Sequence, residues 1–340
     1  MGVYTMMTRT LWSVLAALLL LAGAPASGLA QDRGICTGQA ISVSPALTDL
    51  GPDEYVRLES GPTGFAGGLY PGGSNARPPA HDAAGQAIAR QIVPLNGQGR
   101  PDPAGKIVMI SVGMSNTSSE FNTFMDLVRN DVDANPSLFL VNGAQGGRTA
   151  ERWVNPQGAP WHELDRRLAR YRVTPQQVQV AWIKQTLTRS GDFPAKAEQL
   201  QADLAAIVRN LKSRYPNIKI AYLSSRTRSY TYWRGLSPEP LAFETGFAVK
   251  WLIEQQLQGD PTLNYDPAQG PVKAPYLSWG PYLWSDGITP RSDGLTWLAT
   301  DMLRDCTHPS ASGNRKVAEM LVAFFTSDAT SVDWFLAGRR

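Results

Sequence analysis

The chain alternates short, strongly apolar runs with longer segments in which apolar residues recur at helical spacing. The apolar runs are rich in β-branched and aromatic residues and cover 107–113, 137–142, 178–183, 218–223 and, less evenly, 276–284. An unbroken apolar run is typical of a strand that is buried on both faces of a sheet. Strands that alternate with helices of 10–20 residues predict a parallel sheet covered on both faces. We therefore expect an α/β domain built on about five parallel strands.

The segments between these runs supply the helices. The clearest helix is predicted over 193–215, where Leu200, Leu204, Ile207, Val208 and Leu211 form one apolar stripe. Further helices are expected over 83–92, 161–171 and 241–257, and a final one begins near Ser312. The order of elements predicts a three-layer, doubly wound sheet of the flavodoxin-like kind, in which ligands bind at the carboxyl ends of the strands.

The first 30 residues have the pattern of a secretory signal. Arg9 precedes an apolar run from Leu11 to Ala22, and small residues follow, so cleavage is expected after Ala26 or Ala30. The run is too short for a secure membrane span, and no cysteine stands at the cleavage point. We expect a secreted or periplasmic protein with no stable membrane anchor.

Residues 31–105 are rich in Gly, Pro and Ala. The stretch 61–73 contains so much Gly and Pro that no regular element is expected there. The apolar and aromatic residues of the whole segment 31–105, among them Tyr55, Phe65 and Tyr70, favour an ordered coil that packs on the domain formed by 106–340.

Charge and composition narrow the choice of partner. The formal net charge is +3, the basic residues are scattered, and no nucleic-acid motif is present, so no nucleic-acid partner is predicted. The 10 Trp and 11 Tyr are more informative, because several lie together between 276 and 297. Such a cluster in a loop-rich stretch either lines a pocket or belongs to the core.

Histidine and cysteine usage points away from metal. The three histidines, His81, His162 and His308, have no zinc-ligand spacing, so neither a metal nor a cofactor is predicted. The two cysteines, Cys36 and Cys306, are expected to form a disulfide in an exported protein, and two unpaired buried thiols are the alternative.

Ser115 is the candidate nucleophile. It follows the first buried strand by two residues, and Thr117-Ser-Ser-Glu120 has the form of a capping box that opens a helix. A serine at such a turn can attack a carbonyl whose oxygen lies near the N–H groups of the helix. A histidine base and an orienting carboxylate stand near the far end of the chain as His308 and Asp305, with Asp286 and Asp293 as alternative acids. A turn that only caps a helix is the plain alternative for Ser115.

These residues resemble the motifs of the SGNH (GDSL-like) hydrolase superfamily, in its carbohydrate acetylesterase and sialate O-acetylesterase branch. Gly113-Met-Ser-Asn116 is similar to the first motif, and 142–153, as Asn-x3-Gly-Gly-x3-Glu-x-Trp, is similar to the second. Asp305-x-x-His308-Pro-Ser-x-x-Gly313 matches the last motif closely. The motifs span 107–320, and the Gly-x-Ser-x-Gly elbow of ordinary α/β-hydrolases is absent.

The resemblance implies roles for individual residues. Ser115 is implied as nucleophile, His308 as general base, Asp305 as its orienting acid, and the backbone N–H groups of Ser115 and Gly147 as oxyanion donors. The superfamily places Asn or Gln after the third strand as a third donor. Lys184 stands there instead, with Gln185 beside it. Lys184 is expected either to stabilise the oxyanion or an acidic substrate by charge, or to be the solvated end of a strand. Residues expected to contact the substrate are Asn116, Gln145, Arg148, Trp279, Tyr282 and Trp284.

Three functions compete on this evidence. The first is a secreted serine esterase that removes O-acetyl or similar short-chain esters from carbohydrates, with an acetylated carbohydrate as its substrate and the aromatic cluster stacking on sugar rings. The second is a lipase, arylesterase or polyester hydrolase that uses the same triad on other esters. The third is a catalytically silent glycan-binding protein. This possibility is suggested by Lys184, which stands after the third strand where the superfamily has an oxyanion donor.

Overall fold

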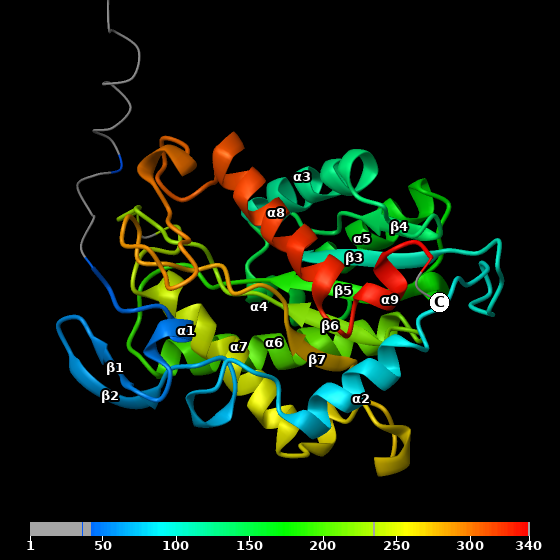
Figure 1. Ribbon diagram of the computed structural model, residues 1–340, viewed down its shortest axis with the longest axis horizontal. Helices are drawn as coiled ribbons and strands as arrows, with labels where there is room; N and C mark the ends of the chain where they lie inside the picture. Colours follow the sequence, from blue (N-terminus) through cyan, green and yellow to red (C-terminus); the bar gives the residue numbers. More distant parts are fainter. Residues whose placement is uncertain (1–35, 37–41, 234, 339–340) are drawn as a thin grey trace, which may run out of the picture.

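The computed structural model describes residues 36, 42–233 and 235–338 (Figure 1). The expected signal segment and its two cleavage positions lie outside these residues. Within the described part of the chain, no helix combines the length and the apolar composition needed to span a membrane.

A five-stranded parallel sheet forms the centre of the molecule. Its strands are β3 (Ile107–Gly113), β4 (Leu138–Val141), β5 (Val178–Lys184), β6 (Ile220–Leu223) and β7 (Tyr276–Trp279). They lie in the order β4-β3-β5-β6-β7, all parallel. This order confirms the predicted doubly wound, flavodoxin-like sheet. The fifth strand ends at Trp279, so the remainder of the apolar run 276–284 is loop.

Helices cover both faces, because the strands are apolar on both sides. One face packs against α4 (Ala150–Trp153), α5 (Ala159–Arg170), α6 (Ala195–Arg214) and α7 (Leu241–Leu257). The other packs against α2 (Pro79–Ala89), α3 (Ser115–Asp131), α8 (Ala311–Ser327) and α9 (Val332–Phe335). Within β3, Val108 and Ile110 face the first core, and Ile107 and Met109 face the second. This two-residue period is the alternation that the pleat of a strand imposes.

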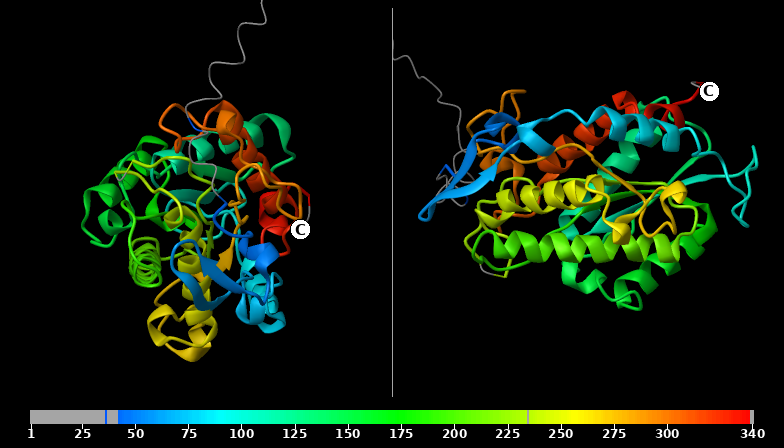
Figure 2. Two further views of the ribbon diagram at one scale, coloured as in Figure 1. Left: turned by 90° about the vertical axis from the view of Figure 1, so that its left-hand side faces the viewer. Right: turned by 90° about the horizontal axis from the view of Figure 1, so that it is seen from below.

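The amino-terminal segment is more regular than its composition predicts. After the short helix α1 (Leu47–Leu50), β1 (Glu54–Arg57) pairs antiparallel with β2 (Gly61–Ala66). The expectation that 61–73 holds no regular element was therefore wrong for its first six residues. Gly61 and Gly64 have φ of 85° and 79°, which side-chain-bearing residues rarely adopt, so here glycine allows an irregular strand where it usually interrupts one. Figure 2 shows this hairpin at the end of the molecule opposite the carboxyl terminus.

Helix α3 begins three residues earlier than the capping-box pattern predicts, because that pattern makes Thr117 the N-cap. Its first residue is Ser115 and its N-cap is Met114, which makes no side-chain cap. The Thr117 hydroxyl donates instead to the Lys184 carbonyl (2.8 Å), and Glu120 binds the Lys184 ammonium. The capping box was wrong because a tertiary partner from β5 takes both side chains.

A disulfide joins Cys36 to Cys306, as the sequence predicts. It spans 270 positions of sequence and fastens the start of the described chain to the loop between β7 and α8. That loop also carries Asp305 and His308.

Candidate active site

Ser115, His308 and Asp305 form a continuous hydrogen-bonded chain at the carboxyl end of the sheet. The Ser115 Oγ lies 2.6 Å from His308 Nε2, and His308 Nδ1 lies 2.5 Å from Asp305 Oδ2. Ser115 reaches this place because β3 ends at Gly113 and α3 starts two residues later. The arrangement is that of a nucleophile, a base and a carboxylate that fixes the ring of the base.

The loop before α8 holds its own acid and base together. Asp305 Oδ1 accepts the backbone N–H groups of His308 (2.9 Å) and Thr307 (3.2 Å), so the carboxylate is fixed before it meets the ring. Burial acts to raise the pKa of Asp305, but the hydrogen bonds from the His308 backbone, the His308 ring and the Thr307 backbone outweigh it and lower the pKa. Asp305 therefore stays ionised through the neutral range.

The alternative acids have other partners. Asp286 accepts from Arg228 Nη1 (2.6 Å) and from the Val43 backbone N–H (3.0 Å). Asp293 pairs with Arg291 on the surface. Asp305 is the carboxylate that contacts His308.

Two backbone N–H groups are available for an oxyanion. Ser115 is the first residue of α3, where helix N–H groups have no partner within the helix. Gly147 lies in an exposed turn with φ of 68°, and its neighbour Gly146 approaches Ser115 so closely that an added Cβ would lie 4.0 Å from the Ser115 Cβ. Neither N–H has a hydrogen-bond partner among the described residues. Both N–H groups are therefore unoccupied within the described part of the chain.

Lys184 is not placed to be a third donor. Its Nζ lies 2.5 and 2.6 Å from the two carboxylate oxygens of Glu120, and both side chains are completely buried. The expected interaction of Lys184 with an oxyanion or an acidic substrate, and the alternative of a solvated strand end, are both inconsistent with this position. The Glu120 carboxylate, about one and a half turns along α3, binds the ammonium instead.

The other polar residues expected at the substrate are held by the protein. Gln185 Nε2 donates to the Arg148 carbonyl (3.3 Å), and Gln145 Nε2 donates to the carbonyls of Gly143 (3.0 Å) and Pro160 (2.8 Å). Asn116 is buried, and its Nδ2 donates to the Thr307 carbonyl (2.7 Å). This bond joins α3, the nucleophile helix that begins at Ser115, to the acid–base loop, residues 302–310, which carries Asp305 and His308. The Arg148 side chain is exposed beside the Gly146-Gly147 turn. Of these four residues, only Arg148 faces solvent.

The aromatic cluster expected to stack on sugars is part of the core. Trp279, Tyr282 and Trp284 are 3%, 4% and 0% exposed. Their polar atoms bond within the protein: Trp279 Nε1 to the Leu69 carbonyl and Trp284 Nε1 to Glu239. The Tyr282 hydroxyl accepts the Leu47 N–H. Trp297 is also buried. The pocket-lining interpretation was therefore wrong, because rings in a coil without periodicity give no sign of which side they face.

Two exposed aromatic residues that the sequence pattern did not single out lie in a loop that contacts the loop of Asp305 and His308. Tyr232 and Trp233 are 76% and 68% exposed, in the loop between β6 and α7. That loop runs beside the acid–base loop, because the Tyr230 N–H donates to the Cys306 carbonyl (2.8 Å) and Ser229 Oγ lies 3.1 Å from Thr307 Oγ1. In the sequence, these residues could have been noticed as the Tyr-Thr-Tyr-Trp run at 230–233, which lies in the polar segment after β6.

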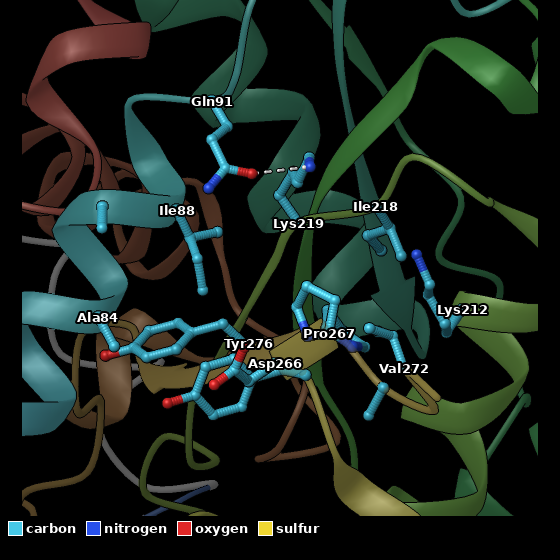
Figure 3. A pocket seen from close by; sticks show the side chains of 14 residues that line it. Ala84, Ile88, Gln91, Lys212, Ile218, Lys219, Asp266, Pro267, Val272 and Tyr276 are labelled. Carbon is cyan, nitrogen blue, oxygen red and sulfur yellow. Dashed lines mark hydrogen bonds between the residues drawn. The ribbon is translucent and has the colours of Figure 1, made fainter. Parts of the chain in front are cut away.

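A separate cavity of about 390 Å³ lies at the other end of the sheet, where β6 and β7 begin (Figure 3). Ile88, Ile218, Val272 and Tyr276 line it, and Lys219 Nζ donates to Gln91 Oε1 (3.0 Å) at its edge. It contains none of the triad residues. Among the described residues, no three His, Cys, Asp or Glu side chains are grouped as a metal site.

Comparison with known proteins gives structural neighbours only. No family model and no curated protein matches the sequence. A carbohydrate esterase family 3 structure from Talaromyces cellulolyticus is similar over 63% of this chain and 94% of its own, with 12% identity and a TM-score of 0.38. A putative acylhydrolase from Bacteroides fragilis is similar over 73% and 96%, with 13% identity and a TM-score of 0.37. A carbohydrate acetylesterase from Xanthomonas citri is similar over 66% and 57%, with 11% identity and a TM-score of 0.36.

By name, these neighbours are a carbohydrate esterase, a putative acylhydrolase and a carbohydrate acetylesterase. With identities of 13% or less and TM-scores below 0.5, they say nothing of this chain's substrate. The activity has to be inferred from the residues around Ser115.

Proposed function

We propose that this chain is an exported serine esterase that hydrolyses O-acetyl or other short-chain esters on carbohydrates through an acyl-enzyme. The observation that supports the proposal is the hydrogen-bonded chain from Ser115 Oγ through His308 to Asp305. The disulfide between Cys36 and Cys306 and the apolar run near the amino terminus support export.

The residues define each proton transfer. His308 Nε2 takes the proton of the Ser115 hydroxyl as its oxygen attacks the ester carbonyl, and the charge on the carbonyl oxygen is held by the N–H groups of Ser115 and Gly147. Asp305 stabilises the imidazolium that forms. His308 then gives the proton to the departing alcohol, which leaves an ester on Ser115. Water attacks this ester with His308 again as base, and the acid is released with Ser115 restored.

Carbohydrate as the alcohol is supported by the loop beside the acid–base loop. Tyr232 and Trp233 present exposed ring faces there, and aromatic rings combine an apolar face with a polar edge, as sugar rings do. Comparing turnover of acetylated xylan with that of long-chain p-nitrophenyl esters tests this part. A preference for the long-chain esters would favour a lipase or arylesterase instead.

Ser115→Ala tests the mechanism. It should abolish hydrolysis of p-nitrophenyl acetate and labelling by a fluorophosphonate, with a melting temperature close to that of the wild type. The matched control is Ser119→Ala in the same helix, whose hydroxyl donates to the Asn116 carbonyl (3.0 Å) and should not be needed for turnover. A wild-type protein that binds acetylated glycan without hydrolysis or labelling would instead be a glycan-binding protein.

A further inference from the structure

A buried ion pair joins Glu120 of α3 to Lys184 of β5. The proposed reaction does not use either residue. Lys184 and Glu120 have no exposed side-chain surface and contact each other through both carboxylate oxygens. Removing two charges from water costs several kcal/mol per ion, and buried pairs are often replaced by apolar residues without loss of stability. A contribution to folding stability therefore does not by itself explain why the chain has an ion pair here.

The pair joins the nucleophile helix to the neighbouring strand. Glu120 lies five residues after Ser115, about one and a half turns along α3. Lys184 is the last residue of β5 and is paired in register with Gly113, the last residue of β3. The Lys184 backbone reaches the same helix, because its carbonyl accepts the Thr117 hydroxyl (2.8 Å). Lys184 thus fixes the first turns of α3 by two independent contacts.

The acid–base loop is attached to the same buried region. Asn116 of α3 donates to the Thr307 carbonyl (2.7 Å), and Arg226 Nη2 lies 3.4 Å from Thr307 Oγ1. Arg226 is buried in the loop after β6, and its Nε has no hydrogen-bond partner. A shift of α3 against β5 would therefore change the distance between Ser115 and His308.

We propose that Lys184 and Glu120 are positioning residues that hold Ser115 at the distance and orientation which His308 requires. The inference rests on the proposed esterase function. It also gives a role to the lysine that stands where the superfamily places a neutral third oxyanion donor. Lys184 acts on catalysis through Glu120 and α3, and it does not touch the substrate.

The charge on the pair gives a measurable signature. Burial lowers the pKa of Lys184 to about 8, although the carboxylate of Glu120 on α3 opposes this, and Arg226 from the loop after β6 lowers it further. When Lys184 loses its proton, Glu120 loses the ammonium that contacts both of its oxygens, and the contact between α3 and β5 weakens. Turnover should therefore fall as the pH rises through about 8.

The test measures kcat and KM for p-nitrophenyl acetate between pH 6 and pH 10, per serine labelled by a fluorophosphonate. Lys184→Met should lower kcat by about 10²-fold, the cost typical of a ~1 Å displacement of a catalytic group, and leave KM within about twofold. Glu120→Gln removes the charge that raises the pKa of Lys184, so the alkaline decline should move down by about one pH unit or more. The near-isosteric Glu120→Gln keeps the test available should Lys184→Met fail to fold.

The matched control is the pair between Arg57 and Glu244, which is largely buried and lies on β1 and α7. Glu244→Gln should lower the melting temperature but leave kcat per labelled serine and the alkaline decline unchanged. If wild-type Ser115 is labelled while Lys184→Met and Glu120→Gln both keep the wild-type kcat and pH profile, the esterase function stands and the positioning role is overturned. If the wild type is neither labelled nor active, the proposed function fails and the positioning role with it.

Discussion

Removing the disulfide should impair catalysis as well as stability. Cys306 lies between Asp305 and His308 and has φ of 62°, a left-handed conformation that costs a residue with a side chain about 1–2 kcal/mol. Three contacts hold it there: its N–H donates to the Leu303 carbonyl, its carbonyl accepts the Tyr230 N–H, and its sulfur is bonded to Cys36. In Cys36→Ser the covalent contact is lost, and the loop can relax towards the right-handed conformation.

The expected stability change follows from the size of the loop that the bridge closes. A cross-link across 270 positions restricts the unfolded chain by an amount worth about 5–6 kcal/mol in the chain-entropy model. When the backbone at Cys306 relaxes, the folded state gains about 1–2 kcal/mol, so the free energy of unfolding falls by roughly 4 kcal/mol in total. For a domain of this size, that corresponds to a melting temperature lower by about 10 °C.

The expected catalytic change follows from the position of the bridge. A displacement of about 1 Å in the His308 ring costs about 10²-fold in turnover. The assay compares kcat for p-nitrophenyl acetate at 25 °C, where every variant is still folded by circular dichroism. The variants are Cys36→Ser and the double variant Cys36→Ser/Cys306→Gly. Reductant should lower kcat of the wild type only.

Glycine at position 306 separates the loss of the covalent bond from the relaxation of the backbone, because glycine adopts positive φ without steric cost. The double variant should keep the left-handed turn and recover much of the turnover that Cys36→Ser loses, while its melting temperature stays low. Equal kcat in both variants would refute the argument from backbone conformation. Wild-type kcat in Cys36→Ser, with only the melting temperature reduced, would show that the bridge stabilises the fold without positioning the site.

Three further predictions follow from the site. Asp305→Asn should lower kcat by about 10⁴-fold with little change in KM, since the ring loses its orienting carboxylate, and steady-state kinetics will show it. Because the pKa of Asp305 is lowered, its contribution to stability should persist above pH ~4 and disappear only as the pH falls through the folded-state pKa, which acid unfolding of wild type and Asp305→Asn can compare. Trp233→Ala and Tyr232→Ala should raise KM for acetylated xylan and leave kcat/KM for p-nitrophenyl acetate unchanged, and an equal loss on both substrates would count against sugar stacking.

The sheet could be predicted from the sequence because its physical cause is local. Strands buried on both faces need largely apolar runs, and 107–113, 178–183 and 218–223 are such runs, each with one polar residue. The contact between Asp305 and His308 is equally local, since a turn places residues three apart together. Their meeting with Ser115 was inferred from the family resemblance and from the rule that sites form at strand ends.

What the sequence did not reveal depends on contacts between distant segments. The Lys184–Glu120 pair forms in a helix that begins at Ser115, and the capping-box pattern placed that start three residues later. Burial of Trp279 and Trp284 depends on the amino-terminal segment and α7, which cover this part of the chain. No periodicity within a coil carries that information, so the same aromatic residues fitted a pocket equally well.

The amino-terminal segment is attached to the connection that carries Asp305 and His308. Besides the bridge from Cys36, the Val43 N–H donates to Asp286, and Asp286 also receives Arg228 from the loop that runs beside His308. The segment thus contacts the connection between β7 and α8 at two places and is linked through Asp286 to the loop after β6, from a position more than 60 residues before the nucleophile in the sequence. Asp286 is therefore engaged by Arg228 and the amino-terminal segment, whereas the His308 ring contacts Asp305. The described partners of Asp305 all lie within its own turn, so this turn alone holds the carboxylate against the His308 ring, while Asp286 joins the amino-terminal segment to the loop after β6.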